Sequence, residues 1–207
     1  MQIALCFILA YLIGSIPSGV WIGRSFFHQD IRQAGSHNIG TTNAYRVLGP
    51  IGGTIVLVMD ILKGTLGAAL PMLLHIPGHY WVLLVGLAAV LGHTKSIFIH
   101  FSGGKAVATS AGICLAYDWH FFLVACAVFI SLVILTSMVS IASTVGMGIV
   151  TLLSIPRHDL LLTVVCVCLW ALFLVRHRQN FARIKAGKEN MVPFGLGIYL
   201  RHRKAKS

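Results

Sequence analysis

Residues 120–138, HFFLVACAVFISLVILTSM, form a stretch of 19 residues without lysine, arginine, aspartate or glutamate. A helix that crosses the hydrocarbon core of a bilayer needs about 20 apolar residues, so this stretch predicts a transmembrane helix. The whole chain has the same character, because 57% of its 207 residues are hydrophobic and only 10% are charged. A soluble domain carries roughly 25% charged residues. We therefore expect an all-α membrane protein.

Six further apolar stretches accompany this one, and two of them, 105–118 and 142–156, are short for a membrane span. The other four cover residues 3–23, 52–74, 79–98 and 159–176. We predict about seven transmembrane helices, or six if the short stretches merge or re-enter the membrane. No linker or low-complexity segment divides the chain, so residues 1–207 are expected to form one membrane domain with a basic cytoplasmic tail from about residue 177.

The basic residues predict the orientation of these helices. With an external N-terminus, 14 of the 16 lysines and arginines fall in cytoplasmic segments or their flanks, as the positive-inside rule requires. The exceptions are Lys63, within a predicted span, and Arg157, in a short external loop. The net charge of +11 therefore indicates orientation, and attraction of residues 201–206 to anionic lipid, rather than binding to nucleic acid.

Gly103, Gly104 and Lys105 form a polar feature between apolar stretches. Adjacent glycines let backbone amides converge on an anion, lysine adds a full positive charge, and a helix that starts directly afterwards adds unpaired N–H groups. The segment is not a Walker A loop, because Ile99 replaces its first glycine and Ala106 its Mg²⁺-binding hydroxyl residue. It predicts a phosphate site without nucleotide hydrolysis; small residues for close helix contact are the alternative.

A second polar segment, residues 35–43 (GSHNIGTTN), ends shortly before Arg46. Its glycine, asparagine and serine residues favour tight turns, and its hydroxyls and amides are neutral hydrogen-bond donors. Arg46 can hold a phosphate through two parallel hydrogen bonds. An ordinary interhelical turn is the alternative, but such a turn does not need so many hydrogen-bonding side chains.

Two further polar breaks follow later in the chain. Residues 139–143 (VSIAS) give a weak signal alone, because hydroxyl side chains often cap helices. Residues 176–180 (RHRQN) end the last span, with His177 and Asn180 about one helical turn apart. His177 can transfer a proton near neutral pH or hold a phosphate. A basic membrane anchor is the alternative, and it accounts for the arginines but not for Asn180.

Other catalytic classes find little support. The five carboxylates do not cluster, and the five cysteines include no Cys-x-x-Cys pair, so neither a metal nor a cofactor is expected. No Gly-x-Ser-x-Gly nucleophile motif exists. Asp60 and Lys63 lie on one face of a predicted span, either as a structural ion pair or in contact with substrate. Chemistry here must depend on positioning and electrostatics.

Together these segments resemble one family, the bacterial acyl-phosphate:glycerol-3-phosphate acyltransferases. The resemblance covers nearly the whole chain and consists of seven blocks in order. They are Gly14-Ser15-Ile16-Pro17, Gly35 to Asn43 with Arg46, Asp60-x-x-Lys63-Gly64, Gly92-His93, Gly103-Gly104-Lys105-x-Val107-Ala108-Thr109, Val139-Ser140-x-x-Ser143, and Arg176-His177-Arg178-x-Asn180.

The resemblance implies a seven-helix enzyme of the bacterial cytoplasmic (inner) membrane with its active site on the cytoplasmic face. It implies transfer of a fatty acyl group from acyl phosphate to the sn-1 hydroxyl of glycerol 3-phosphate, giving lysophosphatidic acid and phosphate, the first step of phospholipid synthesis. A soluble enzyme that makes the acyl phosphate is implied as a partner. No covalent acyl-enzyme is expected, because the donor is already activated.

By the same resemblance, two groups of residues form the site. The catalytic group is Ser36, Arg46, Lys105 and His177, and the phosphate- and substrate-binding group is Asn38, Gly40, Thr42, Asn43, Gly103, Gly104, Ser143 and Asn180. The proton of the attacking hydroxyl passes either to His177 or to a substrate phosphate oxygen; the residues alone leave both open.

Three positions depart from the family pattern. Ala106 and His37 stand where glycine is common, and Ser102 where lysine is frequent. We expect a helical conformation at Ala106, since a left-handed one would strain the loop by about 1 kcal/mol. A transporter of a small organophosphate is the alternative function, although no paired broken helices in repeated halves favour it. A structural membrane subunit would leave the polar segments unexplained.

Overall fold

The computed structural model describes residues 1–204, except for the side chains of His202 and Lys204. Lys206, which was counted in the basic tail, lies outside the described residues. All regular secondary structure in the described part is helical, apart from an isolated bridge between Ser96 and Ser102. The prediction of an all-α protein is confirmed.

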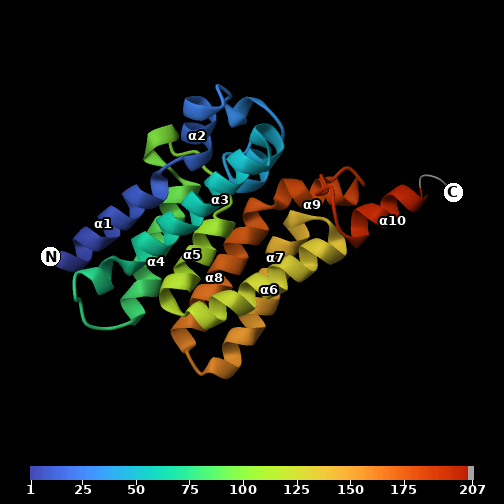
Figure 1. Cartoon of the computed structure of the whole chain (residues 1–207). Coiled ribbons are helices and arrows are strands. Elements are labelled where there is room, and N and C mark those ends of the chain that lie inside the picture. Colours follow the sequence, from blue (N-terminus) through green and yellow to red (C-terminus); the bar gives the residue numbers. More distant parts are fainter. Residues whose placement is uncertain (205–207) are drawn as a thin grey trace. The chain divides into compact units, whose positions relative to one another are not determined.

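The chain divides into two compact units, Met1–Trp119 and a second that starts at His120, and each is described by itself. The first contains α1 (Gln2–Ser15), α2 (Ser18–Phe26), α3 (Thr41–Leu73), α4 (Tyr80–Thr94) and α5 (Val107–Tyr117), shown in Figure 1. Two short 3₁₀ turns, Ile31–Gln33 and Ile97–Ile99, lie in its loops. Helix α3 packs against α1, α4 and α5 and forms the centre of this unit. A single domain over the whole chain stays a prediction.

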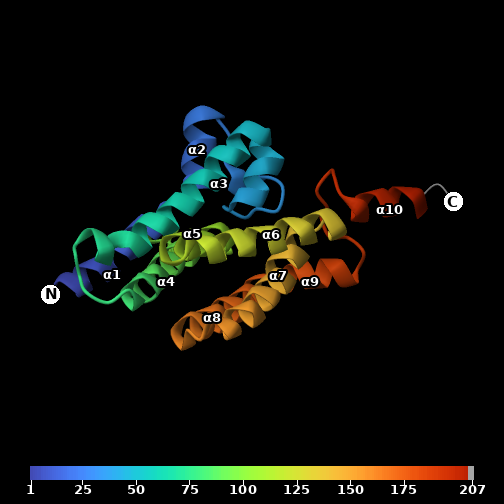
Figure 2. The same ribbon diagram turned by 60° about the horizontal axis from the view of Figure 1, so that its bottom comes forward.

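The predicted helix over residues 3–23 is wrong, because the chain breaks between α1 and α2. Pro17 has no N–H to donate, and the two helices meet at an angle of 43°. Figure 2 shows α2 turning away from the line of α1. The carbonyls at the break find other partners: Ser96 donates its hydroxyl to Ser15, and Lys63 Nζ donates to Ile16 at 2.8 Å.

Helix α3 is broken at Gly49, whose φ of 75° lies in the region that favours glycine. The two stretches on either side fold back on each other. Tyr45 pairs its hydroxyl with that of Thr54 at 2.9 Å, and Thr41 donates to Asp60 at 3.2 Å. The pair Tyr45–Thr54 lies near Gly49 on both sides, and the pair Thr41–Asp60 lies farther from it on both sides. This order is that of an antiparallel helical hairpin. The long second stretch corresponds to the predicted span over residues 52–74.

Glycines let the helices of the first unit approach to backbone contact. A Cβ at Gly64 of α3 would lie 2.1 Å from the carbonyl oxygen of Thr109 in α5, and one at Gly14 of α1 would lie 2.1 Å from that of Ala89 in α4. No larger side chain fits at either crossing. Small residues at helix crossings are the usual device for tight packing in a membrane, where burial of apolar surface gives no driving force between helices.

The second unit contains α6 (Trp119–Thr136), α7 (Val139–Ser154), α8 (Leu160–Arg176), α9 (Arg178–Lys185) and α10 (Leu196–Lys204), with a 3₁₀ turn at Ile155–Arg157. Helices α7 and α8 run side by side in both ribbon views and pack against each other (Figures 1 and 2). Trp170 of α8 donates its indole N–H to the carbonyl of Thr144 in α7 at 2.9 Å. The chain bends by 56° between α8 and α9.

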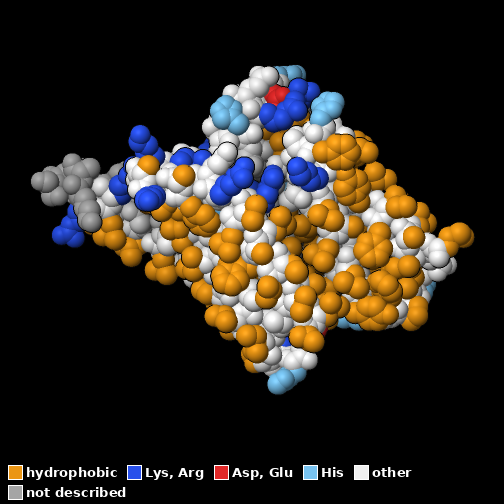
Figure 3. Space-filling view, turned by 180° about the vertical axis from the view of Figure 1, so that it is seen from behind, with side chains coloured by type: hydrophobic (Ala, Val, Ile, Leu, Met, Phe, Trp, Pro, Cys, Tyr) orange, Lys and Arg blue, Asp and Glu red, His pale blue; other side chains and the backbone are white. Residues whose placement is uncertain are grey.

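The surface agrees with a membrane protein. Apolar side chains cover much of the face shown in Figure 3, and residues such as Leu123 and Ile130 of α6 are more than half exposed. In the described part, three helices, α3, α6 and α7 with its 3₁₀ extension, are long and apolar enough to cross a bilayer. The count rises to five if each bent pair, α1–α2 and α8–α9, is one span, while α4 and α5 are shorter apolar helices. Seven spans and the orientation of the termini stay predictions.

Candidate active site

The two glycine-containing loops of the first unit each lead into the start of a helix. Gly40 is the N-cap of α3, and Ala106 is the N-cap of α5. Neither residue has a side-chain acceptor for the first N–H groups of its helix, which have no partner inside the helix. Together with the helix dipole, such N–H groups attract anions. The prediction that a helix begins just after Lys105 is confirmed.

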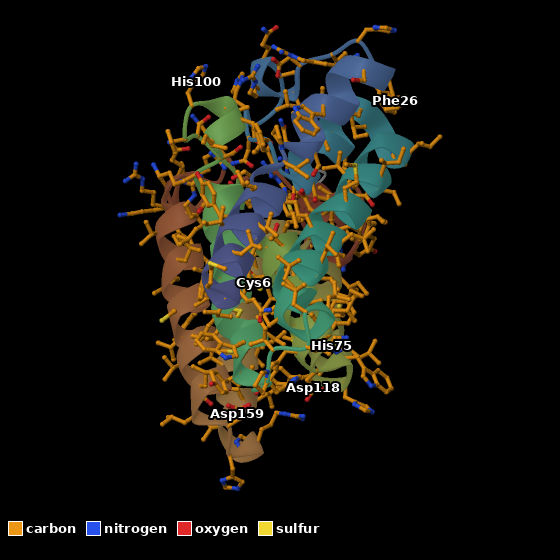
Figure 4. The ribbon with its side chains drawn as sticks, turned by 90° about the vertical axis from the view of Figure 1, so that its left-hand side faces the viewer. Cys6, Phe26, His75, His100, Asp118 and Asp159 are labelled. Carbon is orange, nitrogen blue, oxygen red and sulfur yellow. The ribbon has the colours of Figure 1, made fainter. Side chains whose placement is uncertain are left out.

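Both loops lie at the same end of the first unit. Figure 4 shows Phe26, at the end of α2, and His100, just before the second loop, at one end, with His75 and Asp118 at the other. The first loop follows α2 and the second follows the 3₁₀ turn next to His100. The fold therefore brings the two sequence-predicted phosphate segments to one end of one unit.

Asn43 holds the first loop together. It is 1% exposed, its Nδ2 lies 2.7 Å from the carbonyl oxygen of Ile31 and 2.9 Å from that of Asn38, and its Oδ1 accepts the N–H of Ser36 at 2.7 Å. A Cβ at Gly35 would lie 2.2 Å from that same Oδ1. Both ends of the Asn43 amide are thus occupied by the loop, which gives this residue a role in shaping the site.

The other predicted residues of this segment surround the first turn of α3. Asn38 Oδ1 accepts the N–H of Gly40 at 3.0 Å and fixes the entry into the helix. Ser36 and Thr42 are half-buried, and Arg46 is exposed one turn further along the same short helical stretch. The arrangement places hydroxyls and backbone amides around one helix start, with Arg46 on the same short helical stretch.

The second loop lies directly against the end of α4. The N–H of Gly104 donates to the carbonyl of His93 at 3.1 Å, and a Cβ at Gly104 would lie 2.1 Å from His93 Nε2. A Cβ at Gly103 would lie 2.3 Å from the same carbonyl oxygen. Only glycine permits this approach, which leaves Lys105 half-buried beside the start of α5.

The expectation of a helical conformation at Ala106 is wrong. Its φ of 60° and ψ of 14° are left-handed, and His37, the other position where the family commonly has glycine, has φ 57°. The chain needs a left-handed residue to turn from the Gly103-Gly104 loop into α5, and alanine adopts it at a cost of about 1 kcal/mol. At His37 the ring offsets part of that strain, because its Nδ1 pairs with the carbonyl of Arg32 at 2.9 Å.

A buried charged cluster connects the two loops. Asp60 Oδ1 lies 2.8 Å from Lys63 Nζ and 3.8 Å from His93 Nδ1, while Asp60 Oδ2 accepts the Thr41 hydroxyl at 3.2 Å. Asp60 and Lys63 are 2% and 5% exposed. The ion pair expected as one alternative is present, whereas direct contact of these two residues with substrate stays a prediction.

Asp30 stabilises the entry to the first loop. Its carboxylate binds the side chain of Arg32 at 2.7 Å and that of Arg24 at 2.8 Å, and it caps the 3₁₀ turn by accepting the N–H of Arg32 at 3.0 Å. The hydrogen bonds from Arg32, assisted by Arg24, hold the pKa of Asp30 well below its ordinary value of 3.8. The same contact raises the pKa of Arg32.

The remaining predicted residues lie in the second unit. Ser143 is buried and donates its hydroxyl to the Val139 carbonyl of its own helix at 2.7 Å. His177, at the junction of α8 and α9, donates from Nδ1 to the Phe173 carbonyl at 2.8 Å, so that in the neutral ring Nε2 carries the lone pair. Asn180 Nδ2 donates to Glu189 Oε1 at 2.6 Å.

Several contributing residues were not predicted. Glu189 is 4% exposed and also accepts from Arg183 Nε at 2.8 Å, so it fixes the orientation of Asn180. The sequence could have indicated Glu189, because it is a carboxylate within a basic tail, in a chain that has only five carboxylates. Thr41 and His93 lie in segments that the sequence analysis singled out, but neither was given a role there, because their roles come from tertiary contacts.

Comparisons with known proteins identify the family of this chain. The sequence profile of the family described as glycerol-3-phosphate acyltransferase matches residues 4–187. The glycerol-3-phosphate acyltransferase of Lacticaseibacillus casei (strain BL23) is 65% identical over 207 residues, covering all of both chains. Glycerol-3-phosphate acyltransferase 2 of Lactobacillus acidophilus (strain ATCC 700396 / NCK56 / N2 / NCFM) is 47% identical over 207 residues, covering 100% of this chain and 98% of that one.

Two crystal structures of PlsY (YgiH), described as an integral membrane glycerol 3-phosphate acyltransferase, are also similar. Its glycerol 3-phosphate form is 32% identical with a TM-score of 0.85, covering 93% of this chain and 96% of that one. Its lysophosphatidic acid form is 31% identical with a TM-score of 0.82, covering 92% and 95%. Sequence and structure thus agree, and the chain belongs to the glycerol-3-phosphate acyltransferase family.

Proposed function

We propose that this glycerol-3-phosphate acyltransferase takes its fatty acyl group from acyl phosphate and places it on the sn-1 hydroxyl of glycerol 3-phosphate. The observation that carries the proposal is the pair of glycine-containing loops, each leading into a helix start whose N-cap residue has no side-chain acceptor, at one end of the first unit. The reaction brings together two phosphate groups, one on each substrate. Two anion-binding helix starts match that requirement.

The substrate and product assignments draw support from the relatives. PlsY is described in a glycerol 3-phosphate form and in a lysophosphatidic acid form. We therefore propose glycerol 3-phosphate as the acceptor and lysophosphatidic acid as the product of this chain, with inorganic phosphate released from the donor.

An acyl phosphate is a mixed anhydride and needs no covalent acyl-enzyme. The sn-1 hydroxyl oxygen attacks the acyl carbon, the bond from that carbon to the bridging oxygen breaks, and phosphate leaves with the electron pair. The hydroxyl proton passes to His177 Nε2 or to a phosphate oxygen of a substrate. The protein supplies orientation and positive potential where the phosphate charge grows.

The predicted residues divide the work in this proposal. Lys105 neutralises a phosphate charge beside the Gly103-Gly104 amides, and Arg46 binds phosphate through paired hydrogen bonds. Ser36, Thr42 and the amides at the start of α3 donate further hydrogen bonds, with Asn38, Gly40 and Asn43 shaping that loop. Ser143, His177 and Asn180 keep the binding and catalytic roles that the sequence predicts for them.

We place the reaction on the cytoplasmic face of the bacterial inner membrane. Support comes from the distribution of lysine and arginine, 14 of 16 of which fall in predicted cytoplasmic segments or their flanks. Glycerol 3-phosphate is charged and reaches the site from the cytoplasm. The acyl phosphate comes from a soluble enzyme that phosphorylates or phosphorolyses an acyl group.

Lysine variants test the proposed site. Lys105→Ala is expected to lower kcat/KM at least 100-fold, because a charge-assisted phosphate contact is worth about 3 kcal/mol in a site of low dielectric. Lys95→Ala is the matched control, since Lys95 is exposed and lies between α4 and the following 3₁₀ turn. Initial rates with palmitoyl phosphate and glycerol 3-phosphate give the answer. Equal rates for Lys105→Ala and Lys95→Ala would remove Lys105 from the site.

A further inference from the structure

Asp60 makes more contacts than a structural ion pair requires. It lies in the second stretch of α3 and is 2% exposed. Lys63 Nζ lies 2.8 Å from Oδ1 and His93 Nδ1 lies 3.8 Å from the same oxygen, while Oδ2 accepts a separate hydrogen bond from Thr41 at 3.2 Å. The carboxylate thus contacts groups from α4 and from both stretches of α3.

These contacts end at the two phosphate loops. Thr41 is the first residue of α3, directly after the N-cap Gly40 of the first loop. His93 accepts the N–H of Gly104, in the second loop, on its backbone carbonyl at 3.1 Å. A path of direct contacts therefore runs from the first loop through Thr41, Asp60 and His93 to the second.

Lys63 connects the carboxylate to the break between α1 and α2. Its Nζ donates to the Ile16 carbonyl at 2.8 Å, at this break, where the backbone N–H of Ser18 donates to the same carbonyl at 3.0 Å. A buried ion pair adds little stability over apolar residues of the same volume, because both charges lose their hydration. Stability alone therefore gives no reason for a charged pair at this place.

We infer that Asp60 is a positioning residue that couples the two phosphate loops, so that the starts of α3 and α5 keep the spacing that two phosphate groups need. The inference rests on the proposed function, because it assigns the coupling to the same two loops. Without the contacts of Asp60 to Thr41 and His93, each loop stays intact, but the starts of α3 and α5 can move relative to each other. The affinity for glycerol 3-phosphate therefore falls while the fold persists.

Thr41→Val tests the link most cleanly, since it removes one hydroxyl and keeps the shape. We expect it to weaken glycerol 3-phosphate binding about fivefold to tenfold, the effect of one lost hydrogen bond. Thr41→Ser, which restores the hydroxyl, should recover the wild-type affinity. Thr65→Val is the matched control: Thr65 lies further along α3 and donates to the carbonyls of Ile61 and Gly112, away from both loops.

Binding is measured by titrating purified protein in detergent micelles with glycerol 3-phosphate, without acyl donor, alongside thermal unfolding. Weaker binding in Thr41→Val but not in Thr65→Val, at similar melting temperatures, supports the coupling. Equal affinities for the two valine variants, or failure of Thr41→Ser to restore binding, overturn it.

The double variant Asp60→Leu, Lys63→Met separates positioning from ion pairing. Replacing both charges by apolar residues of similar volume removes the cost of one unpaired buried charge. If the pair is only structural, the double variant has the melting temperature and the glycerol 3-phosphate affinity of the wild type, and the inference falls. If Asp60 positions the loops, the double variant binds glycerol 3-phosphate at least fivefold more weakly than the wild type, although its melting temperature is similar. Should the double variant not fold, the threonine comparison still decides.

The same experiment distinguishes this inference from the proposed acyl donor. Binding of glycerol 3-phosphate is read without donor, so an enzyme that rejects acyl phosphate still reports on the coupling. Conversely, wild-type turnover of acyl phosphate with unchanged binding in Thr41→Val would uphold the donor and refute the coupling.

Discussion

The backbone N–H of Ser36 donates to Asn43 Oδ1 at 2.7 Å, so the first polar loop is fixed to the first turn of α3. The other end of the same amide lies within hydrogen-bonding distance of the carbonyls of Ile31 and Asn38. One buried side chain therefore determines the conformation of the loop and keeps Ser36 beside the helix start. The loop is thus preorganised, and in the function that we propose this lowers the cost of binding a charged substrate.

Asn43→Asp should disrupt this loop with almost no change in volume. The carboxylate still accepts from Ser36, but it faces carbonyl oxygens where Asn43 Nδ2 donated. We expect a loss of about 2–3 kcal/mol in stability and at least a tenfold loss in kcat/KM. Thermal unfolding and initial rates measure both. Asn190→Asp serves as the control, because Asn190 is exposed. If the Asn43→Asp enzyme were as active as this control, the role assigned to Asn43 would be wrong.

Ala106→Gly should stabilise the protein, because glycine adopts the left-handed conformation without the strain that alanine carries. The expected gain is at most about 1 kcal/mol, or a few degrees in melting temperature. Ala111→Gly, in the interior of α5, makes the same chemical change and should destabilise by about 0.5–1 kcal/mol. If both variants lower the melting temperature equally, Ala106 is not strained.

Gly104→Ala should displace the second loop from α4. The added Cβ would lie 2.1 Å from His93 Nε2, so either the ring or the loop must move. We expect a loss of kcat/KM of at least tenfold, about 1.4 kcal/mol of transition-state stabilisation. Gly146→Ala in α7 is the control, since its nearest neighbour would lie at an ordinary 3.4 Å from the new Cβ. Full activity of Gly104→Ala would show that the loop tolerates a side chain there.

Asp30 predicts a pH dependence of stability. Because its pKa is lowered in the folded state, its stabilisation is complete above the ordinary value of 3.8 and is lost as the pH falls below that value. Asp30→Asn should therefore lower the melting temperature at pH 7, and the difference from wild type should shrink as the pH falls below about 4. Melting curves from pH 3 to pH 8 test this; a difference that is constant over the whole range would refute it.

The sequence predicted helical class and most apolar helices because long apolar stretches have few stable alternatives in a membrane. It placed Gly103, Gly104 and Lys105 correctly before a helix start, since glycines and lysine beside an apolar stretch carry a local signal. It did not predict the break at Pro17 within the stretch 3–23, because neighbouring side chains satisfy the freed backbone groups. It also did not predict the helical stretch that precedes Gly49, which lay in a polar segment outside the predicted spans.

The conformation of Ala106 was predicted wrongly because alanine favours helix, and only the turn into α5 imposes the left-handed conformation. The link from Thr41 through Asp60 to His93 was also beyond the sequence, since 19 residues separate the first two and a different helix supplies the third. Residue types reveal which groups are present; the helix crossings decide which of them meet.

A competition between two donors tests the central claim most directly. Purified protein receives glycerol 3-phosphate with equal concentrations of palmitoyl phosphate and palmitoyl-CoA, each carrying a different isotope in the acyl group. We predict that the lysophosphatidic acid formed carries the label of palmitoyl phosphate, at the sn-1 position, with one inorganic phosphate released per molecule. Lysophosphatidic acid that carries the palmitoyl-CoA label, or both labels equally, would contradict the account.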